Sequence, residues 1–381
     1  MRSVVLAGGG SAGHVSPLLA LADCLRRRHP EARITALGTA AGLESRLVPA
    51  RGYRLETLPK VTFPRRLDAA ALSLPGRLAG AVRAADRVVA GADVVVGFGG
   101  YVASPAYLAA KRRGIPVVVH EQNARPGLAN RLGARLTRYV GVTFPDTPLP
   151  HASVVGMPLR REIADLDRAA LRAEALAHYG LDGDRPTLLV TGGSLGAQRL
   201  NTVLGESARD LLDAGVQVVH LCGRGKDVDL SAVGGREPEG GESGTVATGD
   251  SGARYVVREY ADRMELAYAA ADLVVCRSGA NTVCELTAVG LPALFVPLPI
   301  GNGEQRINAA HVVAAGGAQI VDDAVFTPDV VRTQVLPILT DPARLSAMAA
   351  AASSCGERDA DARLADLVEA AVAAGGREGR R

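Results

Sequence analysis

The stretch VVLAGGGSAGHVSPLLALADCL, residues 4–25, combines a short apolar run, a glycine-rich turn and an apolar periodicity of helical spacing. The run at 4–7 predicts a buried strand, and the periodicity at 15–25 predicts a helix. Glycine permits positive φ and the close approach of a ligand, while the free N–H groups of a helix start favour an anion. The stretch therefore predicts a strand, a phosphate-binding loop and a helix; a turn that only packs strand on helix is the alternative.

Residues 8–13 also match G-x-G-x-x-G, the dinucleotide fingerprint, which requires an acid at the end of the next strand. That strand is expected at 33–37, but Glu31 precedes it and Glu44 lies well after it. A nicotinamide cofactor is therefore disfavoured. His14 ends the loop, and histidine readily exchanges a proton near neutral pH. It is a candidate base, with a structural histidine as the alternative.

Length and composition indicate two domains and a cytosolic protein. The chain has 381 residues, and about 150 residues per domain is a useful prior. Aromatic residues make up only 3% and Trp is absent, so the core must consist of Ala, Val and Leu. Five Cys without a C-x-x-C pair indicate reduced thiols. Glycines break the first apolar run, which argues against a signal peptide, and no apolar run is long enough to span a membrane.

Charge is unevenly distributed between the two halves. Residues 1–155 contain 21 Lys and Arg against 9 Asp and Glu, a net +12, and the remainder carries −9. This asymmetry suggests that the first half faces an anionic partner. Nucleic acid is disfavoured, because the basic residues are not interleaved with aromatic ones and no nucleic-acid motif is present.

Apolar, β-branched runs alternate with amphipathic helical segments throughout the chain, which predicts an α/β protein with parallel sheets. Strands are expected at 93–97, 116–120, 188–191, 216–221, 273–276 and 293–297. TLLVTGGSLGAQRLN, residues 187–201, repeats the opening pattern, so two Rossmann-like halves are predicted. Residues 160–180 predict a charged linking helix. The Gly-, Glu- and Ser-rich residues 231–253 predict a mobile surface loop.

The second half adds two segments suited to a nucleotide sugar at the strand ends, where parallel α/β sheets bind ligands. RSGANTVCE, residues 277–285, places a helix start after a strand, and Glu285 could accept hydrogen bonds from a ribose; a solvated surface acid is the alternative. In residues 291–309, Gln305 and Asn308 offer amides that suit sugar hydroxyls, although a capping role is equally compatible.

Eight motifs, in order and over nearly the whole chain, resemble the MurG family of glycosyltransferases: AGGGSAGHVSP, GFGGYVASP, HEQN, VVGMPLR, GGSLGAQRLN, CRSGANTVCE, GLPALFVPLP and NGEQRINA. These enzymes move N-acetylglucosamine (GlcNAc) from UDP-GlcNAc to undecaprenyl-pyrophosphoryl-MurNAc-pentapeptide in peptidoglycan synthesis. The resemblance implies the GT-B fold, in which two Rossmann-like parallel-sheet domains face each other across a deep cleft. It implies an N-terminal acceptor and membrane domain, residues 1–156, with a helix at about 357–375 packing back on it. The C-terminal UDP-GlcNAc domain would span 157–356.

The resemblance also implies roles for individual residues. Ser11, Ala12 and Gly13 would face the transferred sugar and the phosphates, with His14 beside them. Tyr101, Glu121 and Asn123 would lie on the acceptor side, and Arg160 near the hinge. Ser194 and Asn201 belong to the second glycine loop. Ala261 would line the uracil pocket, and Gln305 would contact the sugar hydroxyls. The phosphates and ribose would contact Ala280, Asn281, Thr282, Val283, Cys284 and Glu285.

The sequence departs from the family pattern at a few positions. The first loop is one residue longer than the GGTGGH form and has Ser11 in place of Thr. Met157 stands where Asn is common, and Glu304 replaces the first Gln of a Q-Q pair.

The family reaction inverts the anomeric carbon and needs a general base, for which His14 is the first candidate and Glu121 the second. Helix dipoles and loop N–H groups can stabilise the departing UDP without a metal. Asp227 and Asp229 have D-x-D spacing but lie beside the acidic loop, so no metal or other cofactor is expected. A UDP-GlcNAc 2-epimerase is the nearest alternative function, followed by an oxidoreductase and a nucleotide-sugar sensor.

Residues 60–87 combine apolar side chains with Lys60, Arg65, Arg66, Arg77, Arg83 and Arg87. Such a segment predicts a patch that binds an anionic membrane surface, with an ordinary packed loop and helix as the alternative. The expected location is the cytoplasmic face of the cell membrane, as a peripheral protein.

Overall fold

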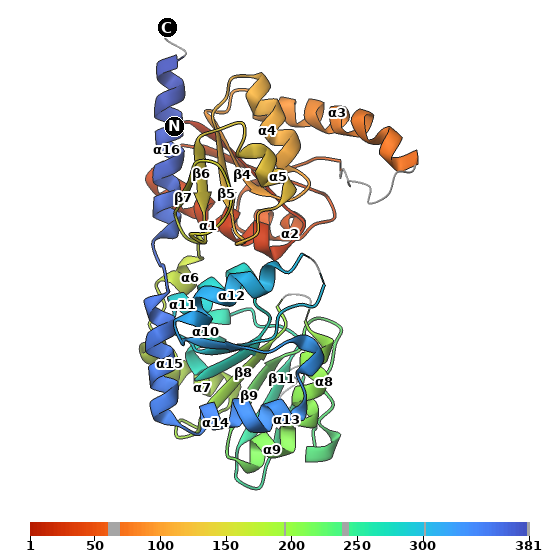
Figure 1. The fold of residues 1–381 in the computed structure, drawn as a ribbon, viewed down its shortest axis with the longest axis vertical. Coiled ribbons are helices and arrows are strands. Elements are labelled where there is room, and N and C mark those ends of the chain that lie inside the picture. The colour runs from red at the N-terminus through yellow and green to blue at the C-terminus, as the bar shows by residue number, and fades with distance from the viewer. Residues whose placement is uncertain (60–68, 194–195, 238–243, 301, 379–381) are drawn as a thin grey trace. The chain divides into compact units, whose positions relative to one another are not determined.

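The chain forms two compact units of α/β structure (Figure 1). A computed structural model describes residues 1–59, 69–193, 196–237, 244–300 and 302–378. The N-terminal unit comprises Met1–Arg160 and Arg358–Arg381, and the C-terminal unit comprises Arg161–Glu357. Within the described ranges, no helix is both long and apolar enough to span a bilayer.

The N-terminal unit is built on seven parallel strands in the order β3-β2-β1-β4-β5-β6-β7. Their bounds are β1 Ser3–Gly8, β2 Arg33–Gly38, β3 Arg54–Thr57, β4 Val94–Gly99, β5 Val117–Glu121, β6 Tyr139–Val142 and β7 Ala152–Val154. The chain runs outward from β1 in one direction to β3 and then in the other from β4 to β7. Strand order thus reverses between β1 and β4, the point at which open α/β sheets bind ligands.

Helices cover both faces of this sheet: α1 Ala12–Arg28, α2 Glu44–Ala50, α3 Ala69–Val89, α4 Ala103–Arg112, α5 Leu128–Gly133 and α16 Ala360–Glu378. Because successive side chains of a strand point to opposite faces, β1 contributes to two cores. Val4 and Leu6 pack in a cluster with α1 and α16, whereas Val5 and Ala7 pack in a cluster with α3 and α4. β1 is therefore buried on both sides, which explains its uninterrupted apolar run.

The C-terminal unit repeats this plan with the strand order β10-β11-β9-β8-β12-β13-β14, in which only the β10–β11 pair is antiparallel. The bounds are β8 Thr187–Thr191, β9 Gln217–Leu221, β10 Thr245–Thr248, β11 Arg254–Arg258, β12 Leu273–Cys276, β13 Ala293–Phe295 and β14 Ala318–Ile320. Here the order reverses between β8 and β12. Each unit thus has a reversal point of the kind at which open α/β sheets bind ligands.

The longer helices of the C-terminal unit are α7 Arg168–Tyr179, α8 Gln198–Glu206, α9 Ala208–Asp213, α10 Met264–Ala270, α11 Ala280–Ala288, α12 Glu304–Ala314 and α15 Pro342–Ser354. Short helical turns complete it: α6 Arg161–Ala164, η1 Ser231–Val233, η2 Asp323–Val325, α13 Pro328–Val330, η3 Val331–Val335 and α14 Leu336–Leu339. One core cluster joins β8, β9, β11 and β12 to α8, α9 and the helical turns that precede α15.

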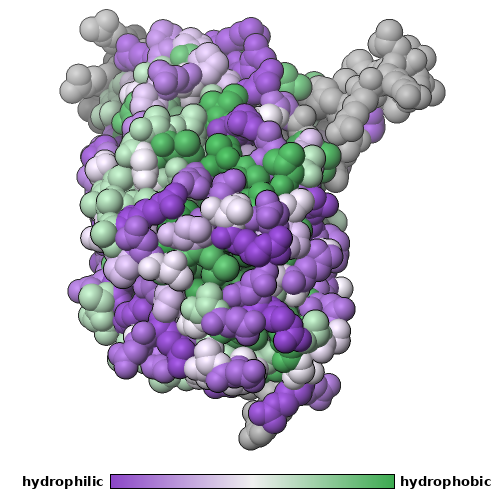
Figure 2. All heavy atoms as spheres, turned by 60° about the horizontal axis from the view of Figure 1, so that its bottom comes forward, coloured by the Kyte–Doolittle hydropathy of each residue, from purple (hydrophilic) through white to green (hydrophobic). Residues whose placement is uncertain are grey.

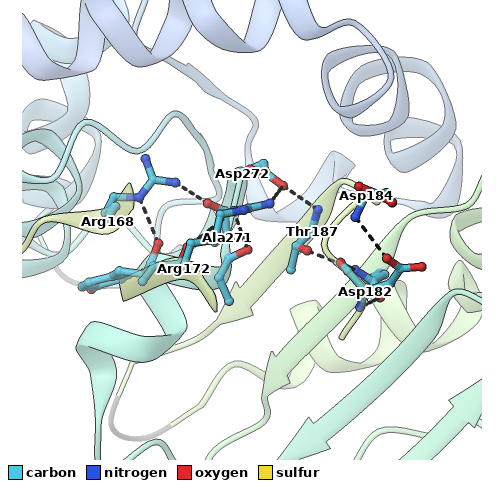
Figure 3. A network of polar contacts seen from close by, with 11 residues as sticks. Arg168, Arg172, Asp182, Asp184, Thr187, Ala271 and Asp272 are labelled. Carbon is cyan, nitrogen blue, oxygen red and sulfur yellow. Dashed lines mark hydrogen bonds and ion pairs between the residues drawn. The ribbon is translucent and has the colours of Figure 1, made fainter. Parts of the chain in front are cut away.

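Two arginines of α7 hold the C-terminal end of α10 (Figure 3). Arg168 donates to the carbonyls of Tyr268, Ala271 and Gly290. Arg172 binds Asp272, whose carboxylate also accepts the N–H of Thr187 at 2.8 Å. Burial lowers the pKa of Arg168 to about 10, so this guanidinium stays charged at neutral pH. The pair satisfies helix-end carbonyls that lack intrahelical partners and ties α7 to the start of β8.

The strands expected from the apolar runs are confirmed as β1, β2, β4, β5, β8, β9, β12 and β13, with ends within two residues. Two other expectations are wrong. Residues 160–180 form two helices, because Asp167 accepts the N–H of Ala170 and caps a new start at Arg168. Residues 231–253 were expected to be a mobile loop, but they include η1 and β10. Val246 and Ala247 are buried there, since the antiparallel pairing with β11 brings them onto the sheet; residues 238–243 lie outside the described ranges.

The face drawn in Figure 2 is a mosaic of hydrophilic and smaller apolar areas. Over the described residues, the large apolar side chains that are exposed include Leu128, Ile300 and Val325. Such residues are ordinary on protein surfaces when they stand singly.

Candidate active site

The first glycine-rich loop joins β1 to α1 at the reversal point of the N-terminal sheet. Gly10 has φ of +93°, a conformation that glycine adopts without strain. Ser11 is the exposed N-cap residue of α1, and Ala12, Gly13 and His14 form its first turn. No acidic residue lies in that turn. The loop and helix start therefore present the positive end of a helix dipole without a competing carboxylate, as an anion requires.

The buried side chain of Glu44 fixes the conformation of this loop. The sequence analysis considers Glu44 only as the acid of a dinucleotide site and rejects it for that role. Glu44 is fully buried; it accepts the Gly10 N–H at 2.9 Å and both the N–H and hydroxyl of Thr39 at 2.7 Å. A Cβ on Gly9 or Gly42 would lie within 2.4 Å of its carboxylate oxygens, so these glycines leave the space that Glu44 fills. Burial alone would raise the pKa of Glu44, but these hydrogen bonds lower it below its ordinary value. Glu44 fixes the loop rather than contacting a ribose.

Glu44→Gln is expected to lower the free energy of unfolding at pH 7 by about 1 to 3 kcal/mol, because an amide leaves buried donors facing its NH2 group. The folded-state pKa lies below the ordinary value of 4.5. The stabilisation is therefore complete above pH 4.5 and is lost as pH falls through the folded-state pKa. Urea unfolding across this pH range should show that the difference in free energy of unfolding between Glu44→Gln and the wild type becomes smaller at low pH. Glu31→Gln, at an exposed acid, is the control. A difference in free energy of unfolding between Glu44→Gln and the wild type that does not change with pH would contradict this role of Glu44.

The loop after β4 packs directly on the first loop. Gly99 and Gly100 both have positive φ, +91° and +78°. A Cβ on Gly100 would lie 2.6 Å from the Gly9 carbonyl oxygen, and one on Gly99 would lie 3.2 Å from Cε1 of His14. These glycines thus allow the His14 ring to lie against the loop. Tyr101 follows them with 42% of its surface exposed.

The third segment at this edge is the end of β5, residues 120–123. Nδ1 of His14 lies 3.0 Å from Oε1 of Gln122, a residue to which the sequence analysis gave no role. The ring of His14 is half-buried. The structure thus brings His14 and the HEQN motif together, although 106 positions separate them in the numbering.

Glu121 is 1% exposed, and both of its carboxylate oxygens accept hydrogen bonds from other residues of the protein. Oε1 accepts from the backbone N–H and the side-chain amide of Asn123, at 2.9 and 3.4 Å. Oε2 accepts the N–H of Gly127 and the amide of Asn130, both at 3.0 Å. Four donors occupy the four lone-pair positions of a carboxylate. This arrangement suits an anchor of the loop between β5 and α5 better than a base, the role that the sequence analysis gave Glu121 as second candidate.

In the C-terminal unit the second glycine loop is shaped by close backbone approach. Gly196 has φ of +64°, and a Cβ there would lie 2.1 Å from the Cys222 carbonyl oxygen. Asn201, which the resemblance assigns to substrate binding, is buried. It donates to the same carbonyl and hydrogen-bonds Nε2 of His220 at 3.1 Å. Asn201 thus fastens α8 to β9; Ser194 lies outside the described residues.

The start of α11 follows β12 at the reversal point of the second sheet. Gly279 is its N-cap, Ala280 to Cys284 form the first turns, and no acid lies in the first turn. Ala280 and Val283 are buried, while Asn281, Thr282 and Cys284 are half-buried. Burial raises the pKa of the Cys284 thiol to about 12, so it is not a nucleophile. This is again an arrangement for binding an anion.

Two side chains beside this helix start add polar groups. The hydroxyl of Ser278 is fully buried and has no hydrogen-bond partner among the described residues. The neighbouring Arg277 donates hydrogen bonds to the carbonyls of Val296 and Pro297 and to the carboxylate of Asp323, the last at 2.5 Å. An unpartnered buried hydroxyl is uncommon in folded proteins and calls for an explanation, such as a bound ion or water.

Glu285 lies farther along α11, half-buried, and Oε2 accepts the hydroxyl of Tyr268 at 2.7 Å. That bond orients the carboxylate of Glu285. Gln305 on α12 uses its Oε1 to accept the Leu298 N–H at 3.0 Å, so it orders the loop after β13. Glu304 exchanges weak hydrogen bonds with Asn302 at the same helix start.

The remaining candidates lie at the margins of the units. Ala261 is half-buried and follows Tyr260, whose exposed ring lies 5.7 Å from the guanidinium carbon of Arg224. Arg160 is half-buried at the end of the N-terminal unit. In the described ranges, no three His, Cys, Asp or Glu side chains are grouped as metal ligands.

Comparison with known proteins adds a consistent set of similarities. Residues 4–142 match the family model of the glycosyltransferase family 28 N-terminal domain, and residues 187–364 match that of its C-terminal domain. The chain is 57% identical over 377 residues to a Clavibacter michiganensis subsp. michiganensis protein, covering 98% of both chains. That protein is named UDP-N-acetylglucosamine--N-acetylmuramyl-(pentapeptide) pyrophosphoryl-undecaprenol N-acetylglucosamine transferase.

Two solved structures are also similar over nearly the full length. MurG of Acinetobacter baumannii is 30% identical with a TM-score of 0.77, covering 97% of this chain and 99% of that one. A Listeria monocytogenes protein described as a UDP-N-acetylglucosamine 2-epimerase has a TM-score of 0.64 but only 14% identity, covering 97% and 96%. The second similarity shows a common fold alone.

Proposed function

Because the chain belongs to glycosyltransferase family 28, we propose that it transfers GlcNAc from UDP-GlcNAc to the 4-hydroxyl of the lipid-linked MurNAc-pentapeptide. The observation that carries this assignment is the 57% identity, over almost the whole chain, to a transferase of that name. The chain is therefore a glycosyltransferase with two Rossmann-like domains, each built on a seven-stranded sheet. The epimerase alternative has only a fold-level likeness behind it.

On the acceptor side, we propose that His14 is the general base. The acceptor hydroxyl oxygen attacks C1 of GlcNAc, UDP leaves with the bonding electron pair, and the hydroxyl proton passes to Nε2 of His14. The position of His14 in the first turn of α1, just after the loop that follows β1, supports this role, with Tyr101 and Asn123 at the same sheet edge. The N–H groups of Ser11 to Gly13 would face the pyrophosphate of the acceptor or donor.

On the donor side, we propose that the diphosphate of UDP binds the start of α11. The helix dipole would stabilise the charge that develops on UDP as it leaves. The Ser278 hydroxyl supplies a donor that is otherwise unused. Glu285 would accept the ribose hydroxyls, Ala261 would border the uracil, and the Gln305 loop would contact the sugar. No metal is expected in this scheme.

UDP release tests the reaction class. The proposed transferase should release UDP at a substantial rate only when the lipid-linked MurNAc acceptor is present. An epimerase that needs no acceptor would instead turn over UDP-GlcNAc alone. Equal rates with and without acceptor would contradict the proposal.

Glu285→Ala is expected to weaken UDP and UDP-GlcNAc equally, because both contain the ribose. Loss of a hydrogen bond to a charged group costs roughly 1.5 to 3 kcal/mol, or about 10- to 150-fold in Kd. Isothermal titration measures both constants. Glu174→Ala, at an exposed position on α7, is the control. An unaltered Kd for UDP would show that Glu285 is a surface acid held by Tyr268.

We also propose that residues 60–87 attach the protein to the cytoplasmic face of the membrane. Residues 60–68 lie outside the described ranges. In the described part of α3, Ala85 and Val89 pack on the N-terminal sheet and Ala81 is buried, whereas Arg83 and Arg87 are exposed. The beginning of α3 extends away from the rest of its unit (Figure 1). Cations and apolar groups in one segment suit an anionic lipid surface.

Arg65→Glu with Arg66→Glu is expected to release the protein from vesicles containing acidic phospholipid, because each basic residue contributes about 1 kcal/mol near such a surface. Co-sedimentation should also fall at high salt, since the attraction is screened. Arg209→Glu with Arg344→Glu makes the same charge change in the C-terminal unit and should leave binding intact. Equal sedimentation with neutral and acidic vesicles, or full binding by the Arg65/Arg66 variant, would remove this segment as the membrane site.

A further inference from the structure

A chain of three hydrogen bonds leads from the core of the N-terminal unit to His14. It begins at His120, which is fully buried on β5 and whose Nε2 lies 2.9 Å from the Gly156 carbonyl oxygen. A carbonyl can only accept, so Nε2 carries the hydrogen. Burial lowers the pKa of His120 to about 4, which keeps the ring neutral at pH 7. In a neutral imidazole the other nitrogen is an acceptor, so Nδ1 of His120 presents a lone pair.

That lone pair orients the next residue. Gln122 is buried, and its amide nitrogen lies 3.0 Å from Nδ1 and 2.9 Å from the carbonyl oxygen of His120. Both neighbours are acceptors and need N–H donors. The NH2 group of Gln122 must therefore face His120, and its carbonyl oxygen must face the opposite way. His120 thus removes the ambiguity that an amide side chain otherwise has.

The carbonyl oxygen of Gln122 meets Nδ1 of His14 at 3.0 Å. Because an amide carbonyl only accepts, the hydrogen of a neutral His14 lies on Nδ1 and its lone pair lies on Nε2. The hydrogen-bonding partner of His14 at Nδ1 is therefore a neutral amide. The ring lies close to Gly99, where an added Cβ would be 3.2 Å from Cε1 of His14.

We propose that His120 and Gln122 are positioning residues that hold His14 in the Nδ1–H tautomer, with Nε2 free to accept a proton. The catalytic consequence rests on the proposed role of His14, whereas the tautomer itself does not. In that role Nε2 takes the proton of the acceptor hydroxyl as its oxygen bonds to C1 and UDP departs. The resulting imidazolium keeps its bond to Gln122 and then releases the Nε2 proton to solvent. The opposite tautomer would present an N–H to the acceptor and could not act as a base.

The tautomer can be read directly in the whole protein labelled with ¹⁵N-histidine. Long-range ¹H–¹⁵N correlations distinguish a protonated from a bare ring nitrogen, and the His14→Ala spectrum assigns the His14 signals among the seven histidines. In the wild type near neutral pH, the expected pattern is a protonated Nδ1 and a bare Nε2. Protonated Nε2 with bare Nδ1 would overturn the proposal without any variant.

Gln122→Met tests the cause. The thioether is similar in length but cannot accept this hydrogen bond strongly, so both tautomers of His14 should appear. The kcat should fall by roughly 10- to 100-fold, by analogy with the loss of the partner that orients a metal-bound histidine, while KM for UDP-GlcNAc is unchanged. Gln217→Met is the matched control, because Gln217 is equally buried but lies on β9 of the other unit. It should leave the His14 signals and kcat as in the wild type.

The outcomes separate this inference from the proposed function. A single Nδ1–H tautomer that persists in Gln122→Met would overturn the positioning role. An Nδ1–H tautomer that is lost in Gln122→Met supports it, even if His14→Ala remains active. An active His14→Ala variant would instead overturn the proposal that His14 is the general base.

Discussion

His14→Ala is expected to lower kcat by about 10²- to 10⁴-fold, the usual contribution of a positioned general base. The attacking hydroxyl would then keep its proton while its oxygen bonds to the sugar, which raises the barrier. The affinity for UDP should not change, because His14 belongs to the N-terminal unit and the nucleotide is expected to bind the C-terminal unit. Steady-state rates at saturating UDP-GlcNAc and titration with UDP measure the two quantities.

His178→Ala is a suitable control for this experiment, since His178 is an exposed histidine on α7. It should retain the wild-type kcat. If His14→Ala lost UDP-GlcNAc binding while its kcat persisted, His14 would be a binding residue and the base would have to be sought elsewhere.

Glu121→Ala is expected to destabilise the N-terminal unit strongly. It would remove the acceptor of the Asn123 and Gly127 N–H groups and of the Asn130 amide. A buried donor left without an acceptor costs about 1 to 3 kcal/mol, and several are affected at once. The thermal midpoint should therefore drop by many degrees, and activity should fall because the loop after β5 loses its shape.

Glu121→Gln separates an anchor from a base. An anchor predicts a lower thermal midpoint, because the NH2 group of glutamine would face two of the four donors. A base predicts an unchanged midpoint with a collapsed kcat. The second outcome would restore the alternative that the sequence analysis held open. Glu162→Gln, an exposed acid on α6, controls for charge removal.

The central strands could be predicted from sequence because they are buried on both faces and form uninterrupted apolar runs. β3 and β7 could not, since they are short, partly exposed edge strands without such runs. Strand β10 was obscured by the Gly- and Glu-rich composition of residues 231–253. Only the pairing with β11, through Val246 and Ala247, shows that part of this segment belongs to the sheet.

The sequence predicted a site residue where its role depends on neighbours in the same loop. It did so less well where the role depends on residues that are far away in the sequence. His14 follows a recognisable glycine pattern. The role of Glu44 depends on the Gly10 N–H, which is 34 positions away, and that of Gln122 depends on His14, which is 108 positions away. Asn201 and Glu121 have residue types that suit a ligand. Nothing in the sequence indicates that Cys222, His220 and Asn130 already occupy their polar atoms.

The central claim, transfer of GlcNAc to the lipid-linked acceptor with inversion, is most directly tested by following one carbon. UDP-GlcNAc labelled with ¹³C at C1 is incubated with the protein and the lipid-linked MurNAc-pentapeptide, and the organic and aqueous phases are analysed by NMR. The account predicts that the label moves into the lipid fraction, with the one-bond C1–H1 coupling of a β-linkage. Label that stays in the aqueous phase as a sugar epimer, or reaches the lipid in an α-linkage, would contradict it.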